Sequence, residues 1–289
     1  MTKATSHVPR KDLGLIARLS RARPTKPGET YGVPGHGNTL WLSVLSISLF
    51  VFVWWLVTAM GWVKPLFVPS PMAIIQKFVD VWNAGYTGTP FLEHVGISTA
   101  RVFGAFILAC VIGIPLGLAM GMSPVMRGLF DPPIEFYRPI PPLAYLPLMI
   151  IWFGIGETSK VLLIFLSVFA PVVLGARSGV KSAAIEQIHA AYSFGASRWQ
   201  VLRHVIMPSA MPEILTAMRI GIGFGWTTLV AAEMVAATKG LGYMVLSASQ
   251  FLQTPVVIMG IFVIAFIAFA FDLLMRFIER RLVPWKGRM

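Results

Sequence analysis

The sequence predicts an all-α protein that crosses a lipid bilayer several times. Its 289 residues are 56% apolar and only 12% charged, whereas soluble domains carry about 25% charged residues. The apolar residues gather in runs of roughly 20, the length that a helix needs to span the hydrocarbon core. Lys and Arg outnumber Asp and Glu by 24 to 12 and flank the apolar runs, as the positive-inside rule predicts. This placement favours a polytopic membrane bundle over a nucleic-acid-binding protein.

Six segments are apolar and long enough to span a membrane. They cover residues 40–62, 96–121, 128–152, 160–180, 211–236 and 256–278. The first follows a basic tail, residues 1–39, in which we find no short charged start and cleavage site of a secretory signal. We therefore expect the first segment to be a retained span.

The third segment contains six prolines between Phe130 and Pro147. Each proline removes a backbone donor and crowds the preceding helical turn. We therefore expect this segment to be broken and enclosed by protein. In the second segment, Gly113, Gly117 and Gly121 share one helical face, which favours close packing of another helix over a moving hinge.

The distribution of charge predicts the orientation of the bundle. With the N-terminus inside, 17 Lys and Arg lie on the inner side and 4 on the outer side. Both termini are therefore expected in the cytoplasm. This gives a cytoplasmic tail over 1–39, a transmembrane domain over 40–279 with a cytoplasmic loop at about 181–210, and a cytoplasmic tail over 280–289.

Several motifs of catalysis and cofactor binding are missing from the sequence. None of the 26 glycines is followed by Lys, so the chain lacks the Gly-Lys pair of a phosphate-binding loop. The histidines are scattered and Cys110 is the only cysteine, which excludes an intrachain disulfide and indicates no metal site. We expect a chain that is not itself an enzyme and binds no cofactor.

The loop at 181–210 carries the most informative motif. It has an amphipathic pattern at helical spacing, formed by Ile188, Ala191, Tyr192, Val201, Leu202 and Val205. Gly195 interrupts the pattern, where a helix is expected to end. By pattern alone, the loop could also be an amphipathic linker on the membrane surface.

This loop resembles the Glu-Ala-Ala loop of ABC importer permeases. Ala190, Ala191, Gly195 and Pro208 match that pattern in identity and spacing, Val205 and Met207 are conservative substitutions, and His189 replaces the glutamate. The resemblance implies a coupling helix that docks in a groove of an ATPase subunit. The residues implied in coupling are His189, Ala190, Ala191, Gly195, Ala196, Ser197, Arg198, Val205, Met207 and Pro208.

Further motifs resemble the taurine, sulfonate and nitrate branch of these permeases. They are Phe67–Pro71, Arg138–Ala144 and Trp152–Lys160. Within the branch, residues 212–216, 225–233 and 280–285 look most similar to taurine permeases. Permeation of nitrate or of other alkanesulfonates remains the alternative.

The resemblance also implies an assembly. It consists of two copies of this chain, each with six spans around the five-helix core of type I importers, two cytoplasmic ATPases that bind ATP and Mg, and one periplasmic binding protein. The complex would lie in the bacterial cytoplasmic membrane. An ion-coupled secondary transporter would show an inverted repeat with two broken segments, and a membrane enzyme would gather acids and histidines near one membrane face; neither pattern appears.

Charged residues within spans suggest where a solute could pass. Arg138 and Glu233 are the candidates to meet a sulfonate and an ammonium group, although Arg138 could equally bind the carbonyls of the broken helix. Trp226, Thr227 and Thr228 could line the pathway, with lipid or helix contact as the alternative for Trp226. For Arg101, Arg219 and Asp272 we expect snorkelling toward the membrane surface.

Overall fold

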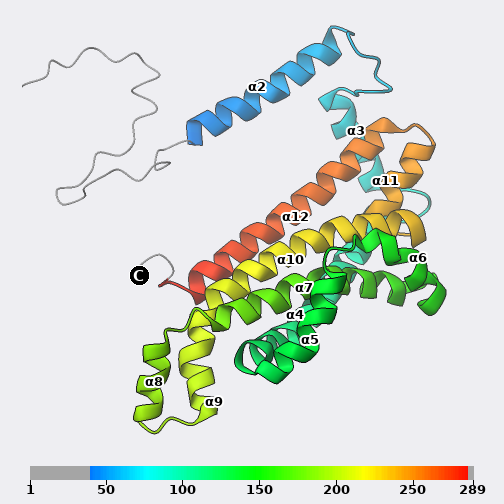
Figure 1. Ribbon diagram of the computed structural model, residues 1–289. Helices are drawn as coiled ribbons and strands as arrows, with labels where there is room; N and C mark the ends of the chain where they lie inside the picture. The colour runs from blue at the N-terminus through cyan, green and yellow to red at the C-terminus, as the bar shows by residue number, and fades with distance from the viewer. Residues whose placement is uncertain (1–39, 286–289) are drawn as a thin grey trace, which may run out of the picture. The chain divides into compact units, whose positions relative to one another are not determined.

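The computed structural model describes residues 40–285, and it divides the chain into two units, residues 1–71 and 72–289. The expected tail at 1–39 and residues 286–289 lie outside the described residues. Helices account for nearly all of the regular structure that is described (Figure 1). The described residues also contain one isolated β-bridge, between Tyr86 and Thr89. The predicted all-α fold is confirmed.

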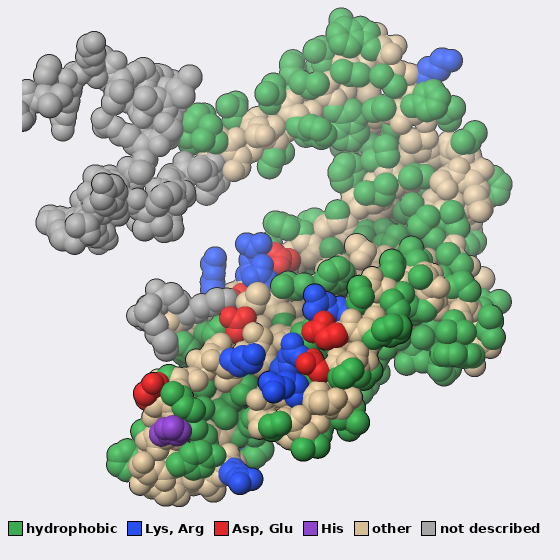
Figure 2. Space-filling model, viewed as in Figure 1, with side chains coloured by type: hydrophobic (Ala, Val, Ile, Leu, Met, Phe, Trp, Pro, Cys, Tyr) green, Lys and Arg blue, Asp and Glu red, His purple; other side chains and the backbone are tan. Residues whose placement is uncertain are grey.

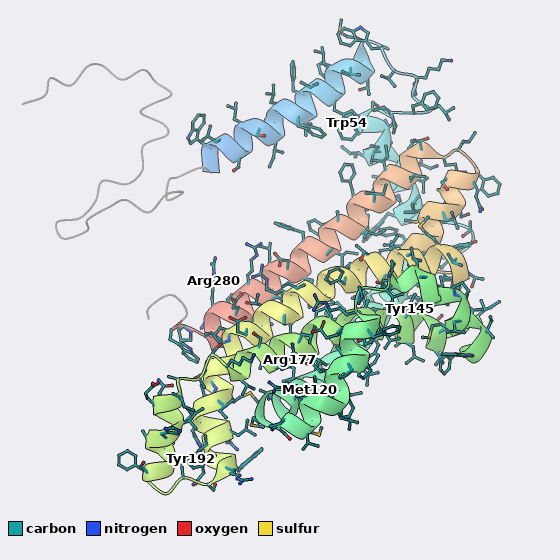
Figure 3. The ribbon with its side chains drawn as sticks, in the orientation of Figure 1. Trp54, Met120, Tyr145, Arg177, Tyr192 and Arg280 are labelled. Atoms are coloured by element: carbon teal, nitrogen blue, oxygen red, sulfur yellow. The ribbon has the colours of Figure 1, made fainter. Side chains whose placement is uncertain are left out.

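The first unit is built on helix α2, Leu40–Ala59. It carries no charged residue and is strongly apolar, so it is suited to a hydrocarbon environment. The connector that follows folds back on the helix, because the indole Nε1 of Trp54 donates a hydrogen bond to the carbonyl of Pro69 at 3.1 Å (Figure 3).

The second unit holds four further helices that are long and apolar enough to cross a membrane. They are α4 (Phe91–Met122), α7 (Glu157–Val180), α10 (Met207–Ala236) and α12 (Thr254–Leu282). Helix α7 lies between α4 and α10 and packs extensively on both (Figure 1). Shorter helices α3 (Pro71–Ala84) and α11 (Leu241–Gln250) complete one end of the bundle.

The third predicted span is broken, as its prolines indicate. Helix α5 runs over Pro124–Tyr137 and the short apolar helix α6 over Pro142–Phe153, with residues 138–141 between them. Pro139 and Pro141 cannot donate backbone hydrogen bonds, so one continuous helix through this stretch would lack the hydrogen bonds that these two residues normally donate.

Small residues allow the central helices to approach closely. A Cβ at Gly117 would stand 2.7 Å from the Ala176 Cβ, and one at Gly113 would stand 3.2 Å from Val172. The predicted packing face of α4 therefore contacts α7. On the other side of α7, Gly175 meets Ala217 and Gly179 meets Ala210 of α10 in the same way.

The outer surface is rich in large apolar side chains (Figure 2). Phe50, Ile151 and Phe266 are each more than 70% exposed. A surface of this kind in water would be a site of aggregation or association. It is the surface that a lipid bilayer solvates.

Candidate functional site

Two short helices project from the bundle between α7 and α10 (Figure 1). Helix α8 covers Ile185–Ser193 and α9 covers Arg198–Val201, and a π-helical turn, η1 (Leu202–Ile206), leads into α10. Gly195 lies between α8 and α9 with φ +82°, a conformation that glycine adopts at no steric cost. The predicted helix end at Gly195 is confirmed.

The turn after Gly195 is fixed by local hydrogen bonds. The Ala196 amide donates to the Ala191 carbonyl at 3.1 Å. Ser197 and Gln200 form a capping box, in which each side chain bonds the other residue's backbone amide. These bonds satisfy amides that the start of a helix would otherwise leave without partners.

One face of this projection is packed and the other is open. Ile188, Ala191, Leu202 and Val205 pack around the buried Val201 and its neighbours, as the amphipathic pattern predicts. Tyr192, assigned by the pattern to the same face, is exposed.

The open face carries large rings that the sequence pattern did not single out. Phe194 is 93% exposed and Trp199 is 66% exposed. His189, Ala190, Gly195, Ser197 and Arg198 are exposed as well. Open rings beside small residues make a surface suited to docking another protein.

A cavity of about 540 Å³ lies beside the break between α5 and α6. Residues on both sides of the break form one part of its wall, and residues of α7 and α10 form the rest. Arg138 lies on this wall and forms an exposed ion pair with Glu135 at 3.3 Å. The wall also carries the aromatic rings of Tyr137, Tyr145 and Phe224.

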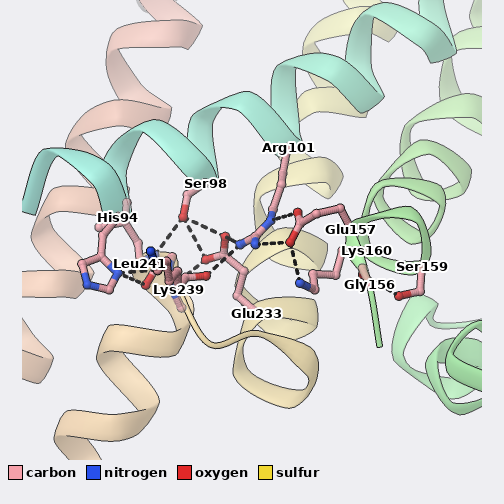
Figure 4. A network of polar contacts seen from close by, with 12 residues as sticks. His94, Ser98, Arg101, Gly156, Glu157, Ser159, Lys160, Glu233, Lys239 and Leu241 are labelled. Carbon is pink, nitrogen blue, oxygen red and sulfur yellow. Dashed lines mark hydrogen bonds and ion pairs between the residues drawn. The ribbon is translucent and has the colours of Figure 1, made fainter. Parts of the chain in front are cut away.

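A buried ionic network joins three helices at the end of the bundle opposite the projection (Figure 4). Arg101 of α4 is only 6% exposed. Its Nη1 lies 2.7 Å from Oε1 of Glu233 on α10, and its Nε and Nη2 each lie 2.6 Å from a carboxylate oxygen of Glu157 on α7. The prediction that Arg101 snorkels is wrong, because this guanidinium is neutralised inside the protein.

Every oxygen of the Glu233 carboxylate is occupied by a protein donor. Besides Arg101, it accepts hydrogen bonds from the Ser98 hydroxyl at 2.8 and 2.9 Å and from the Gly242 amide at 2.8 Å. A fully buried charge of this kind is stable only with such partners. A Cβ at Gly240 or Gly242 would collide with Glu233, so the close approach of this loop requires glycine.

The five residues predicted to line a pathway are not brought together. Arg138 lies on the cavity wall, whereas Glu233 lies in the buried network. Trp226 and Thr228 are buried in the bundle, and the exposed Thr227 hydroxyl donates to the Phe224 carbonyl. Their contact with a solute stays a prediction, and in the described conformation Arg138 is best placed for it.

Two further arginines within the helices are also paired. Arg219 of α10 binds Asp272 and Glu279 of α12, each at 3.2 Å. Arg177 of α7 binds Asp131 of α5. These contacts link neighbouring helices, so Arg219 and Asp272 serve packing where we expected snorkelling.

Three comparisons place these features among known proteins. Residues 113–284 match the family described as binding-protein-dependent transport system inner membrane component. The chain is 53% identical to the taurine transport system permease protein of Escherichia coli strain K12, over 86% of this chain and 90% of the relative. It is 33% identical to a putative aliphatic sulfonates transport permease protein of the same organism, over 81% and 88%.

A solved structure shares the fold at lower identity. An inward facing conformation of the MetNI methionine ABC transporter superposes with a TM-score of 0.52 and 20% identity. The match covers 64% of this chain and 94% of that chain.

Proposed function

Because the chain belongs to the family of binding-protein-dependent transport system inner membrane components, as an ABC transporter permease of the taurine, sulfonate and nitrate branch, we propose that two copies of it form the pathway for taurine or a related sulfonate. The similarity to a taurine permease over 86% of the chain carries the choice of solute. Less similar relatives are named for aliphatic sulfonates and for nitrate, and these solutes are the alternative.

The projection formed by α8 and α9 is proposed as the surface that docks on the ATPase. Its open face offers Phe194 and Trp199 beside Gly195 and Ala190, and aromatic rings are the side chains that most often anchor such contacts. The proposed coupling residues are those of the loop: His189, Ala190, Ala191, Gly195, Ala196, Ser197, Arg198, Val205, Met207 and Pro208. The capping box and the inner apolar face would keep this surface rigid during docking.

The chain itself is proposed to supply the conduit, with ATP and Mg bound by two partner ATPases. Closure of the ATPase pair would draw the two projections together and open the bundle toward the periplasm. Release of the nucleotide would reverse the change. A periplasmic binding protein would deliver the solute to the end of the bundle that holds Arg101 and Glu233.

The membrane orientation is proposed from the charge count. Both termini, including the tails at 1–39 and 280–289, would lie in the cytoplasm, on the same side as the projection. The permease domain would cover residues 40–279. Figure 1 supports the part of this arrangement that lies in the second unit, since the end of α12 and the projection lie toward the same end of the bundle.

The cavity beside the α5–α6 break is proposed as part of the pathway. A broken helix within a membrane is tolerated where it is buried in protein or lines a cavity, and residues 138–141 do line one. Arg138 would give the sulfonate a cationic contact at this point. Its ion pair with Glu135 is exposed and therefore weak enough to exchange.

Deletion of this chain in its natural host tests the function. Growth with taurine as sole sulfur source should be lost, and growth on sulfate should be unchanged. Expression of the chain from a plasmid should restore growth. Loss of growth on nitrate, or only on longer alkanesulfonates, would contradict taurine as the solute while leaving the importer class intact.

A further inference from the structure

Glu213 is an unusual carboxylate among the described membrane-crossing helices α4, α7, α10 and α12. Glu93, Glu157, Glu233, Asp272 and Glu279 on these helices each pair with a Lys or Arg within 4 Å. Glu213 has no such partner among the described residues, and its side chain is exposed. An ionisable group without a partner within a transmembrane segment is a candidate for contact with a transported solute.

Glu213 lies on the wall of the cavity beside the α5–α6 break. The charged residues on this wall are Arg138 and Glu213, and the other lining residues described are neutral. The formal charges of the lining residues therefore cancel, and Arg138 also pairs with Glu135, which does not line the cavity. A solute that carries one cation and one anion would match this wall better than a simple anion would.

The two charges lie near the same stretch of α7. Glu135, the partner of Arg138, also lies 3.6 Å from Arg177 of α7, and the Glu213 carbonyl lies 3.5 Å from the Cβ position of Gly175, two residues before Arg177. A small solute would therefore meet both charges in the same part of the cavity.

We propose that Glu213 selects solutes that carry an ammonium group, because it is the carboxylate without an ion-pair partner among the described residues on the cavity wall that also carries Arg138. This inference rests on the proposed function. A carboxylate beside a partly apolar passage repels a bare sulfonate and attracts an ammonium group, as charged side chains do in selective channels. In an assembly of two copies, two such carboxylates would act on the same solute.

The test compares two solutes that differ at one group. Taurine and isethionate share the sulfonate and the two-carbon chain, and isethionate has a hydroxyl in place of the ammonium group. Uptake of each would be measured in proteoliposomes that contain the complete transporter and binding protein, with each solute saturating the binding protein. The variants are Glu213→Gln, which removes the charge at nearly equal size, and the matched control Glu213→Asp, which keeps it.

We expect the ratio of taurine to isethionate uptake to fall about tenfold in Glu213→Gln, the change expected for loss of one charge contact. The ratio in Glu213→Asp should stay within about twofold of the wild type. An equal loss of both solutes in Glu213→Gln would overturn the inference and assign Glu213 to an ion pair with the second copy. A wild-type complex that imports no taurine would instead contradict the proposed function, before any variant is compared.

Discussion

The guanidinium of Arg101 on α4 lies 2.7 Å from the carboxylate of Glu233 on α10, 132 residues further along the chain. Both side chains are buried, and Glu157 contacts the same guanidinium from α7. The central helices of the bundle are thus joined at one end by a single cation.

Replacement of Arg101 by Met should strongly destabilise the protein. The substitution leaves the Glu233 carboxylate buried without its cation, which typically costs about 3–5 kcal/mol. Unfolding by denaturant in detergent micelles would measure the free energy of unfolding. The double variant Arg101→Met/Glu233→Met should recover part of the loss, because no unpaired charge then remains. Arg138→Met is the control, since the exposed Arg138–Glu135 pair should contribute at most about 1 kcal/mol.

Enlargement of Gly117 should separate α4 from α7. A side chain at this position meets the Val173 carbonyl and the Ala176 methyl group, and we expect Gly117→Val to lower the free energy of unfolding by about 1–3 kcal/mol or more. Gly104→Val on the same helix is the matched control, because nothing lies within 4 Å of its Cβ position. Equal melting temperatures for the two purified variants would contradict the packing role of Gly117.

A charge at Gly195 should uncouple ATP hydrolysis from transport. A Cβ at this position meets nothing within 4 Å in the chain, and Asp is one of the residues that adopt a positive φ at modest cost. Gly195→Asp should therefore leave the protein inserted in the membrane and act mainly on a docked partner. Uptake should fall at least about tenfold while the ATPase stays active. Gly195→Asn has nearly the same size and tolerates a positive φ, so it separates the effect of charge from that of bulk. Normal uptake by Gly195→Asp would show that the ATPase docks elsewhere.

Replacement of His189 by Glu, the residue of the related motif, should be tolerated. The His189 side chain is exposed on α8, so the change places no charge in the packed face of the projection. We expect uptake within about twofold of the wild type, measured in the same proteoliposomes, since exposed substitutions rarely alter stability by more than about 0.5 kcal/mol. Complete loss of transport would instead assign a specific role to the histidine.

Reporter fusions should place the C-terminus and the turn between α3 and α4 on opposite sides of the membrane. A reporter after Met289 should lie in the cytoplasm. A reporter inserted at Gly88, in the turn between α3 and α4, should lie in the periplasm, as 17 inner against 4 outer basic residues predict. Detection of both reporters on one side would contradict the six-span topology.

Features with a local cause could be predicted from the sequence. The spans follow from the length of the apolar runs, the break at 138–141 from its prolines, and the turn at Gly195 from an interrupted helical pattern. The Gly117 face likewise contacts a neighbouring helix as predicted. In each case one stretch of chain contains the whole physical reason.

Features that depend on distant partners could not be predicted in this way. An arginine inside an apolar run either reaches the membrane surface or has a partner, and nothing near Arg101 in the sequence identifies Glu157 or Glu233. The start of α4 at Phe91, earlier than the predicted residue 96, likewise involves distant partners. Glu93 pairs with Lys239, and the His94 Nδ1 accepts a hydrogen bond from the Gly240 amide. The exposure of Phe194 also depends on which face of α8 the bundle covers.

The helix that leaves the projection continues without a break from Arg198 to Ala236, through the π-helical turn. Near the projection, Gly175 and Gly179 of α7 lie against Ala217 and Ala210 of this helix, which brings the two backbones close. If α10 pivoted at this close approach, its segment from Ala217 to Glu233 would be a lever arm of about 24 Å. A tilt of about 5° would move Glu233 by roughly 2 Å, enough to part it from Arg101. Movement at the end that carries the projection would then loosen an ion pair at the opposite end of the bundle.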